Sequence, residues 1–235
     1  MPRFLVFTLA AQIASFGDLA GHERRGGDTW PGRSALIGLI GGALGVRRDD
    51  RAGQERLRTL RFAVAAHEVG KSLRDYHTVQ SVPSTIKRPA TRADALRQGA
   101  AQHRLNTSIT QRDYRTGVHH AVAAWDPDGA NDLDAIAGAM RRPRFTPYLG
   151  RKSCPLSRPM APIVVEAPNP LAALRSLPEA LLEPPSFVAT EAFEGIDDRA
   201  ASVSWRHDDP VDRTQWHFAA RAVHVLRGEA MGWNA

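Results

Sequence analysis

The alternation of apolar and polar positions predicts regular elements in the first part of the chain. Residues 3–10 (RFLVFTLA) form an apolar run of strand length, and residues 34–45 (SALIGLIGGALG) are apolar nearly all round, which is typical of a buried helix. Pro31 and Gly32 precede this helix, and Gly45 marks its end. Its four glycines lower helix propensity, so we expect a sheet to pack closely against it.

The same periodicities predict four further elements: a helix at 54–60, strands at 61–69 and 116–125, and a helix at 131–140. Asn131 is a suitable N-cap for the last of these helices. Residues 17–32 read as a Gly-rich polar loop. Between residues 70 and 111 the periodicity fades and small, polar and basic residues accumulate, so we expect a long surface excursion there.

The last third of the chain is rich in proline and short strands. Eight of the sixteen prolines fall within residues 155–185, which favours a connector with a strand at 163–166 and a short helix at 170–177. Residues 187–226 resemble several short strands. The order of elements predicts an α+β fold with a ferredoxin-like half over 1–150, followed by a smaller β-rich portion over 151–235.

Composition narrows the protein class. A chain of 235 residues with 43% hydrophobic and 24% charged residues is long enough, and ordinary enough, to fold around its own core. The single cysteine, Cys154, excludes an internal disulfide or a multi-cysteine zinc site. The longest apolar stretch, residues 34–46, is too short to cross a bilayer, and no secretory signal opens the chain. We therefore expect a cytoplasmic protein with no membrane contact.

Positive charge is segregated along the chain. The net charge is +6, and two stretches are strongly basic: residues 71–112 carry eight basic side chains and two acids, and residues 135–165 carry six and none. Eleven of these fourteen basic residues are arginines, which bind phosphate with two parallel hydrogen bonds and stack on bases. A solvated basic surface is the plain alternative, but two acid-poor blocks favour a nucleic-acid partner.

A weak phosphate-loop pattern precedes the glycine-rich helix. Residues 27–34 (GDTWPGRS) match the spacing, with Arg33 where the pattern requires lysine and no buried strand directly before it. Nucleotide hydrolysis is therefore not expected. Arg33 and Ser34 still stand at a helix N-terminus, where free N–H groups attract an anion, so they are candidates to hold an RNA phosphate. The alternative is that Ser34 only caps the helix.

Metal and nucleophile chemistry find little support in the sequence. None of the nine histidines stands in a zinc-binding pattern, and no metal or other cofactor is expected. His119 and His120 are adjacent on a predicted strand and point to opposite faces, so they cannot easily bind one ion together. Either ring could act as a general base in metal-free RNA cleavage, but nothing fixes an acid–base pair.

Residues 141–154 (RRPRFTPYLGRKSC) combine aromatic rings with cations. Phe145 and Tyr148 lie among arginines and a lysine, which is the composition of surfaces that stack bases and bind the phosphates of single-stranded RNA. Rings buried beside exposed cations are the alternative.

Several blocks in order carry a resemblance to a known family. They are DTWPGRSALIGLIGGALGVRRDD (28–50), RDYHTV (74–79), ITQRDYRTGVHHAVAAW (109–125) and RPRFTPYLGRKSCPLSRP (142–159). Together they closely resemble the CasD family, whose members cap the 5′ end of the guide RNA in type I-E CRISPR Cascade. The resemblance implies a ferredoxin-like RNA-recognition core, a thumb-like hairpin excursion and no catalytic activity.

The resemblance also implies site residues and partners. The thumb falls at about residues 71–111, where contacts from Lys87, Arg88 and Arg92 are expectations without a family motif. The RNA-binding candidates are Arg33, Ser34, Arg112, Arg141, Tyr148, Arg151 and Lys152. The implied partners are the 5′ handle of CRISPR RNA (crRNA), the backbone and large Cascade subunits and, through the complex, target DNA.

An enzyme is the main alternative. Relatives in another Cascade subtype cut precursor RNA themselves, and this chain offers acid and base groups in His119, His120, Tyr148 and Lys152. A purely structural assembly subunit is a third possibility. The family resemblance favours the first reading, a binding subunit that is not an enzyme.

Overall fold

The computed structural model describes residues 1–21, 23–83, 89–102, 104–178, 184–191, 193, 201–231 and 233. The elements in chain order are β1 (Arg3–Ala14), β2 (Gly17–Ala20), β3 (Arg24–Gly27), α1 (Arg33–Leu44), α2 (Arg51–Arg58), β4 (Arg61–Ser81), α3 (Arg92–Ala101), β5 (Asn106–Trp125), α4 (Leu133–Arg141), β6 (Ile163–Glu166), α5 (Pro170–Leu174), β7 (Phe187–Thr190), β8 (Ala201–Asp212), β9 (His217–Leu226) and a 3₁₀ helix (Gly228–Met231).

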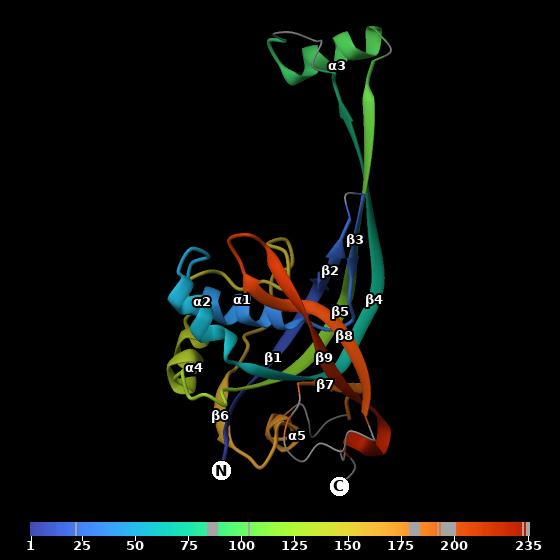
Figure 1. Ribbon diagram of the computed structural model, residues 1–235. Coiled ribbons are helices and arrows are strands. Elements are labelled where there is room, and N and C mark those ends of the chain that lie inside the picture. Colours follow the sequence, from blue (N-terminus) through green and yellow to red (C-terminus); the bar gives the residue numbers. More distant parts are fainter. Residues whose placement is uncertain are drawn as a thin grey trace.

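One large, mainly antiparallel sheet organises the described strands (Figure 1). Its central order is β6-β1-β5-β4, in which every neighbouring pair is antiparallel, and α1 and α4 connect strands that are not adjacent. Strands β7, β9 and β8 continue from the free edge of β4. The mixed helix and strand class is therefore confirmed, and the C-terminal strands extend the same sheet.

Strand alternation divides the core between the two faces of the sheet. On β1, Leu5, Phe7 and Leu9 pack with α1, α2 and α4, whereas Phe4 and Val6 pack with α5 on the opposite face. The predicted strand is thus buried on both faces, which explains its continuous apolar run. The sheet bends so far that its edge strand β8 contacts α1.

A long hairpin projects from this body and carries α3 at its tip (Figure 1). It consists of the distal halves of β4 and β5, which pair from Lys71 opposite Thr116 to Ser81 opposite Asn106. We call residues 71–111 the thumb. Its β4 half is exposed at nearly every position, so no apolar face repeats with period two, and the sequence pattern fades although the strand continues.

Two glycines lie where the hairpin leaves the body. Gly70 and Gly117 both have positive φ, and a Cβ on Gly70 would collide with the Thr116 carbonyl on the facing strand. Only glycine adopts this backbone conformation without strain. The two positions therefore fix where the thumb begins.

The surroundings of α1 correct the expectation for its glycines. The helix does pack on the sheet, but among the described residues the atoms nearest to its glycines belong to other elements: a Cβ would meet Leu57 of α2 at Gly41, the Arg213 guanidinium after β8 at Gly38, and the Arg144 side chain at Gly45. Gly45 ends the helix in the left-handed conformation, and the backbone N–H of Arg144 donates to the Ala43 carbonyl at 3.0 Å. These glycines admit neighbouring side chains and a docked loop.

Two local predictions were also wrong. Residues 17–32 are not only loop, because β2 and β3 pair within them. The cap of α4 is Asp132, whose carboxylate accepts from the N–H groups of Asp134 and Ala135. Asn131 instead donates to the Arg56 carbonyl at 2.8 Å and so ties this turn to α2.

Among the described helices, none has the length and apolar character needed to cross a membrane.

Candidate nucleic-acid interface

A row of cationic and aromatic side chains lies on one face at the base of the thumb. Paired residues in a ladder project to the same face, and β3 and β5 place Arg25 beside Arg112. Tyr114 follows two positions later on β5 and so projects to the same face. The Arg151 guanidinium lies over its ring, 4.6 Å from the centroid. We call Arg25, Arg112, Tyr114 and Arg151 the basic face.

Among the described residues, no carboxylate forms an ion pair with the arginines of this face, although Asp75 projects to the same side. Asp75 lies opposite Arg112 on β4, but its carboxylate is 3.0 Å from His77 Nδ1. Neither Arg25 nor Arg112 has an ion pair with a described residue. The face therefore carries three arginines against one carboxylate, with the half-buried Tyr114 ring beneath Arg151.

On the opposite face of the same strands, two arginines share one carboxylate. Asp113 accepts from Arg74 Nε at 2.7 Å and lies 3.2 Å from Arg24 Nη2. The hydrogen bond from Arg74 is the main cause that lowers the pKa of Asp113 below its ordinary value. Arg24 and Arg25 are neighbours in sequence, yet of the two only Arg24 forms an ion pair with a described carboxylate.

The 141–154 block forms a loop that is held against the end of β1. The Ser15 N–H donates to the Leu149 carbonyl at 3.0 Å, and Tyr148 forms a backbone bridge with Pro155. Gly150 has φ +85, and a Cβ there would collide with the Ser15 carbonyl. Leu149 is buried in the core, whereas the Tyr148 side chain is 40% exposed. The loop thus presents Tyr148 beside a fixed backbone.

The remaining cations of this block differ in how they are held. Lys152 and Arg142 are exposed, and no described residue pairs with them. Arg141 is also exposed, but its Nη2 donates to the Pro162 carbonyl at 2.6 Å. Phe145 is 49% exposed. Surface cations and rings therefore coexist here, as the residue pattern predicts for an RNA surface.

Of the three candidate residues at the thumb tip, Arg92 lies within the described residues. Arg92 begins α3, is exposed, and donates from Nη2 to the Gln80 carbonyl at 2.9 Å, which ties α3 to β4. Lys87 and Arg88 lie outside the described residues.

Arg33 and Ser34 occupy a different environment from the one expected. The Arg33 side chain is only 2% exposed, and its Nη1 donates to Glu191 at 2.7 Å while its Nε donates to Asp209 at 3.1 Å. The Ser34 carbonyl accepts from Arg213 at 2.6 Å, and the N-cap of α1 is Gly32. Neither residue is available to a phosphate.

The anion at this helix end belongs to the chain itself. The Arg33 N–H donates to the Asp208 carboxylate of β8 at 2.8 Å, and a Cβ on Gly32 would collide with that carboxylate. The phosphate-loop resemblance thus reflects real anion binding at a helix N-terminus. The expectation of an RNA phosphate there is wrong because Asp208 occupies the position.

Several arginines join the same ionic cluster. Arg221 donates to Asp208 at 2.6 Å, Arg206 lies 2.6 Å from Asp28, and Arg58 lies 3.1 Å from Asp209. Burial tends to raise the pKa of Asp208, but the hydrogen bond and charge of Arg221, with the charge of Arg206, lower it overall. We call Arg33, Arg58, Arg206 and Arg221, with their carboxylates, the arginine cluster.

The two adjacent histidines lie on opposite faces of β5, as strand alternation predicts. His120 is fully buried against Phe16, and neither ring nitrogen has a hydrogen-bond partner among the described residues. Burial is the main cause that lowers the pKa of His120 to about 3, so the ring is neutral at pH 7. His119 stacks on His67 and contacts Arg158 at 2.6 Å. The described residues contain no group of three or more His, Cys, Asp or Glu side chains arranged to hold a metal.

Sequence reasoning missed Arg25 because it placed residues 17–32 in a loop. Strand pairing brings this arginine next to Arg112, across 86 intervening positions that no local pattern connects. The family resemblance did point to Arg112, but Tyr114 acquires its role only through Arg151 above its ring.

The chain is similar to known proteins over nearly its whole length. The family model described as CRISPR-associated protein (Cas_Cas5) matches residues 4–224. The chain belongs to this family. The sequence resemblance is therefore confirmed. A relative in this family, the CRISPR system Cascade subunit CasD of Escherichia coli (strain K12), is 29% identical over 244 residues, covering 97% of each chain.

Two solved structures share the fold. One, titled "CRISPR RNA-guided surveillance complex", aligns with a TM-score of 0.65 and 24% identity, over 95% of this chain and 89% of the other. The other, titled "Crystal structure of Cas protein", aligns with a TM-score of 0.56 and 24% identity, over 97% and 96%. Each alignment covers nearly the whole of this chain.

Proposed function

We propose that the protein is a non-catalytic subunit of a type I-E CRISPR Cascade complex that binds and caps the 5′ handle of crRNA. It helps to assemble the backbone, and the complex then recognises foreign DNA through the guide RNA, so this subunit meets target DNA only indirectly. The family membership supports the setting, and the name of the E. coli relative supports Cascade. The cytoplasm is the compartment expected for such a complex.

The observation that carries the proposal is the basic face. Arg25, Arg112 and Arg151 have no carboxylate partner among the described residues, and Tyr114 lies between them. When arginines without a carboxylate partner bind the phosphates of RNA, they release the counterions that had condensed on the RNA. Aromatic rings add affinity by stacking on bases. Tyr148 and Lys152 extend the proposed surface along the loop.

The order β6-β1-β5-β4 supports a ferredoxin-like core. The chain runs β1, α1, β4, β5, α4, β6, with α2 added after α1, and the two central strands are β1 and β5. This order agrees with the split βαβ arrangement of the ferredoxin-like fold and so supports that part of the proposal. The thumb is then an extension of the central hairpin, so its base is fixed by the core.

The thumb also offers a protein surface. Leu73, Tyr76, Val79 and Ile109 are each between 42% and 57% exposed on its strands. Strand register puts Leu73 and Val79 on one face of the hairpin and Tyr76 and Ile109 on the other, so both faces offer exposed apolar side chains for a contact. We propose that they meet the neighbouring backbone subunit, while Arg92 holds the tip helix in place for that contact.

Cleavage of precursor crRNA by this chain is the less favoured alternative. His120 cannot serve as base because its ring is enclosed in the core, and its low pKa keeps it from acting as an acid. His119 projects from the opposite face of β5, beside His67 and Arg158. The candidates Tyr148 and Lys152 lie in a loop on the other edge of β1, with no acid–base pair formed.

The test compares handle-specific binding with cleavage. The full chain should bind an RNA that carries the repeat-derived 5′ handle more tightly than the same RNA with a scrambled handle, and Arg112→Gln, which removes a phosphate contact, should weaken the binding of both. Repeat RNA incubated with the protein in EDTA should stay intact. Equal affinity for both RNAs would end the binding proposal, and specific cleavage that His119→Ala abolishes would establish the enzyme.

A further inference from the structure

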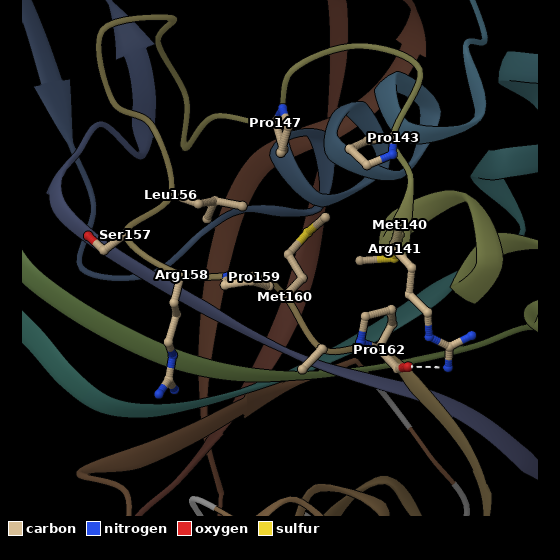
Figure 2. Close-up of a pocket in the computed structure, with 11 residues that line it drawn as sticks. Met140, Arg141, Pro143, Pro147, Leu156, Ser157, Arg158, Pro159, Met160 and Pro162 are labelled. Carbon is tan, nitrogen blue, oxygen red and sulfur yellow. Dashed lines mark hydrogen bonds between the residues drawn. The ribbon is translucent and has the colours of Figure 1, made fainter.

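A pocket of about 510 Å³ lies between the end of α4 and the loop that follows it (Figure 2). This volume is within the range of small-molecule sites. Most of its lining is apolar and comes from two methionines, a leucine, an alanine and four prolines: Met140, Met160, Leu156, Ala161, Pro143, Pro147, Pro159 and Pro162. Figure 2 shows these side chains directed around a common space.

The walls of this pocket are fixed before any ligand arrives. Prolines restrict φ, and two backbone hydrogen bonds join the wall to β1: Thr8 N–H donates to the Met160 carbonyl at 2.9 Å, and Ser157 N–H donates to the Ala10 carbonyl at 2.8 Å. Ala161 has φ +46, a conformation that a residue other than glycine rarely adopts. Strain of this kind accumulates at binding sites.

Charge at the rim selects an anion. Arg141 and Arg158 both line the pocket, and Arg141 is held by its bond to the Pro162 carbonyl. Residues 135–165 contain no acidic side chain. The occupant is therefore a molecule with an apolar, flat part and a negative charge beside it.

The pocket adjoins the proposed RNA surface along the chain. Tyr148 and Pro155 form a backbone bridge, and the next residue on each side, Pro147 and Leu156, lines the pocket. A single RNA strand that stacks on Tyr148 can thus place a neighbouring nucleotide here. A docked peptide would need backbone partners, but the four wall prolines have no N–H to donate.

We propose that this pocket receives one unstacked base of the RNA handle, with the phosphate of that nucleotide bound by Arg141. The proposal rests on the proposed function and adds to it a base subsite. Because prolines and methionines contact the flat faces of a base, this site selects the presence of a base more than its identity. Removal of that one base should weaken binding on the order of 5- to 150-fold.

An abasic scan tests the subsite. Handle RNAs that each lack one base are titrated against the full chain, and one position should stand out in the wild-type protein. Leu156→Trp fills the pocket, so the same abasic RNA should then bind no worse than the intact RNA. Val203→Trp, at a 53% exposed position on β8, is the matched control and should keep the wild-type profile.

A second variant, Arg141→Gln, tests the subsite independently in case Leu156→Trp disturbs the fold. Arg141→Gln should lower the slope of log affinity against log salt by about 0.7. Arg47→Gln, at a side chain that is 77% exposed and does not line the pocket, should leave the slope unchanged. Circular dichroism and urea unfolding establish that each variant is folded.

Each outcome of these experiments bears on either the base subsite or the proposed function. If Leu156→Trp and Arg141→Gln keep the wild-type abasic profile and affinity, the subsite is overturned while handle binding stands. If the variants bind RNA normally but no longer assemble with protein subunits, the pocket holds a protein segment and the proposal is likewise overturned. If the wild type does not distinguish a handle from a scrambled RNA, the proposed function itself fails.

Discussion

Arginines fill two regions of this protein, and the two regions differ in what surrounds the guanidinium groups. In the arginine cluster, Arg33 is 2% exposed and contacts two carboxylates. On the basic face, Arg112 has no described carboxylate partner. The first region joins α1 to β8 and β7, and the second lies at the base of the thumb.

The difference shows that arginine content alone does not locate an RNA surface. A buried, paired arginine is part of the fold, because its charge is already balanced and removing it takes a buried cation away from its carboxylates. An arginine without a carboxylate retains its attraction for phosphate. Pairing between distant strands decides which role each arginine takes, so variants that separate stability from RNA affinity test the comparison.

The largest expected effect concerns the arginine cluster. Arg33→Met leaves Glu191 and Asp209 without their buried cation and should lower the free energy of unfolding by about 3–5 kcal/mol. Urea unfolding of the full chain measures this loss. Arg47→Met, an exposed control whose pair with Asp49 is solvated, should cost at most about 1 kcal/mol.

RNA affinity completes this test. The folded fraction of Arg33→Met should bind handle RNA as the wild type does, since the cluster is not part of the proposed surface. A small loss of stability together with a large loss of RNA affinity would contradict the distinction between the two regions.

Tyr148→Ala should give the reverse pattern. Loss of a stacking ring should weaken RNA binding by about 1–3 kcal/mol, and the unfolding free energy should change little because the side chain is 40% exposed. Fluorescence anisotropy with labelled handle RNA measures the first quantity. Unchanged affinity would remove Tyr148 from the proposed surface.

The sequence predicted much of the fold where one chain segment decides its own structure. Periodicity found the first strand and α1, and glycine marked the end of α1 at Gly45. It did not follow β4 beyond Val69 because the thumb is exposed on both faces and has no alternating pattern. Strand character there comes from pairing with β5, which is a long-range contact.

The candidate site was predictable only in part for the same reason. Charge segregation and the aromatic loop correctly indicated that Tyr148 and Lys152 are exposed. The sequence alone could not show that Asp208, 175 positions after Arg33, occupies the N-terminal end of α1. Nor could it bring Arg25 beside Arg112, because that neighbourhood depends on a strand in a segment that reads as loop.

Lowering the pH should reduce the stability of the fold without changing the charge of the arginines on the basic face. His120 has a pKa of about 3 in the folded chain against about 6.5 when unfolded, so the unfolded chain binds the proton first. Stability should therefore fall as the pH drops below about 6.5, by up to about 1.4 kcal/mol per pH unit, while arginines stay charged.

His120→Leu isolates this contribution. The substitution should remove that slope between pH 6.5 and 4.5, and it should raise stability at pH 7 because two unpartnered ring nitrogens leave the core. Urea unfolding at a series of pH values measures both effects. An undiminished slope in the variant would show that His120 is not the group that titrates.

The most direct measurement compares two neighbouring arginines on β3. Arg25 lies on the basic face, and Arg24 faces Asp113 on the other side of the same ladder. Handle RNA is titrated at a series of salt concentrations with the wild type, Arg25→Gln and Arg24→Gln. We predict that the slope of log affinity against log salt falls by about 0.7 in Arg25→Gln and is unchanged in Arg24→Gln. Equal slopes for the two variants would contradict the claim that the arginines without carboxylate partners hold the RNA.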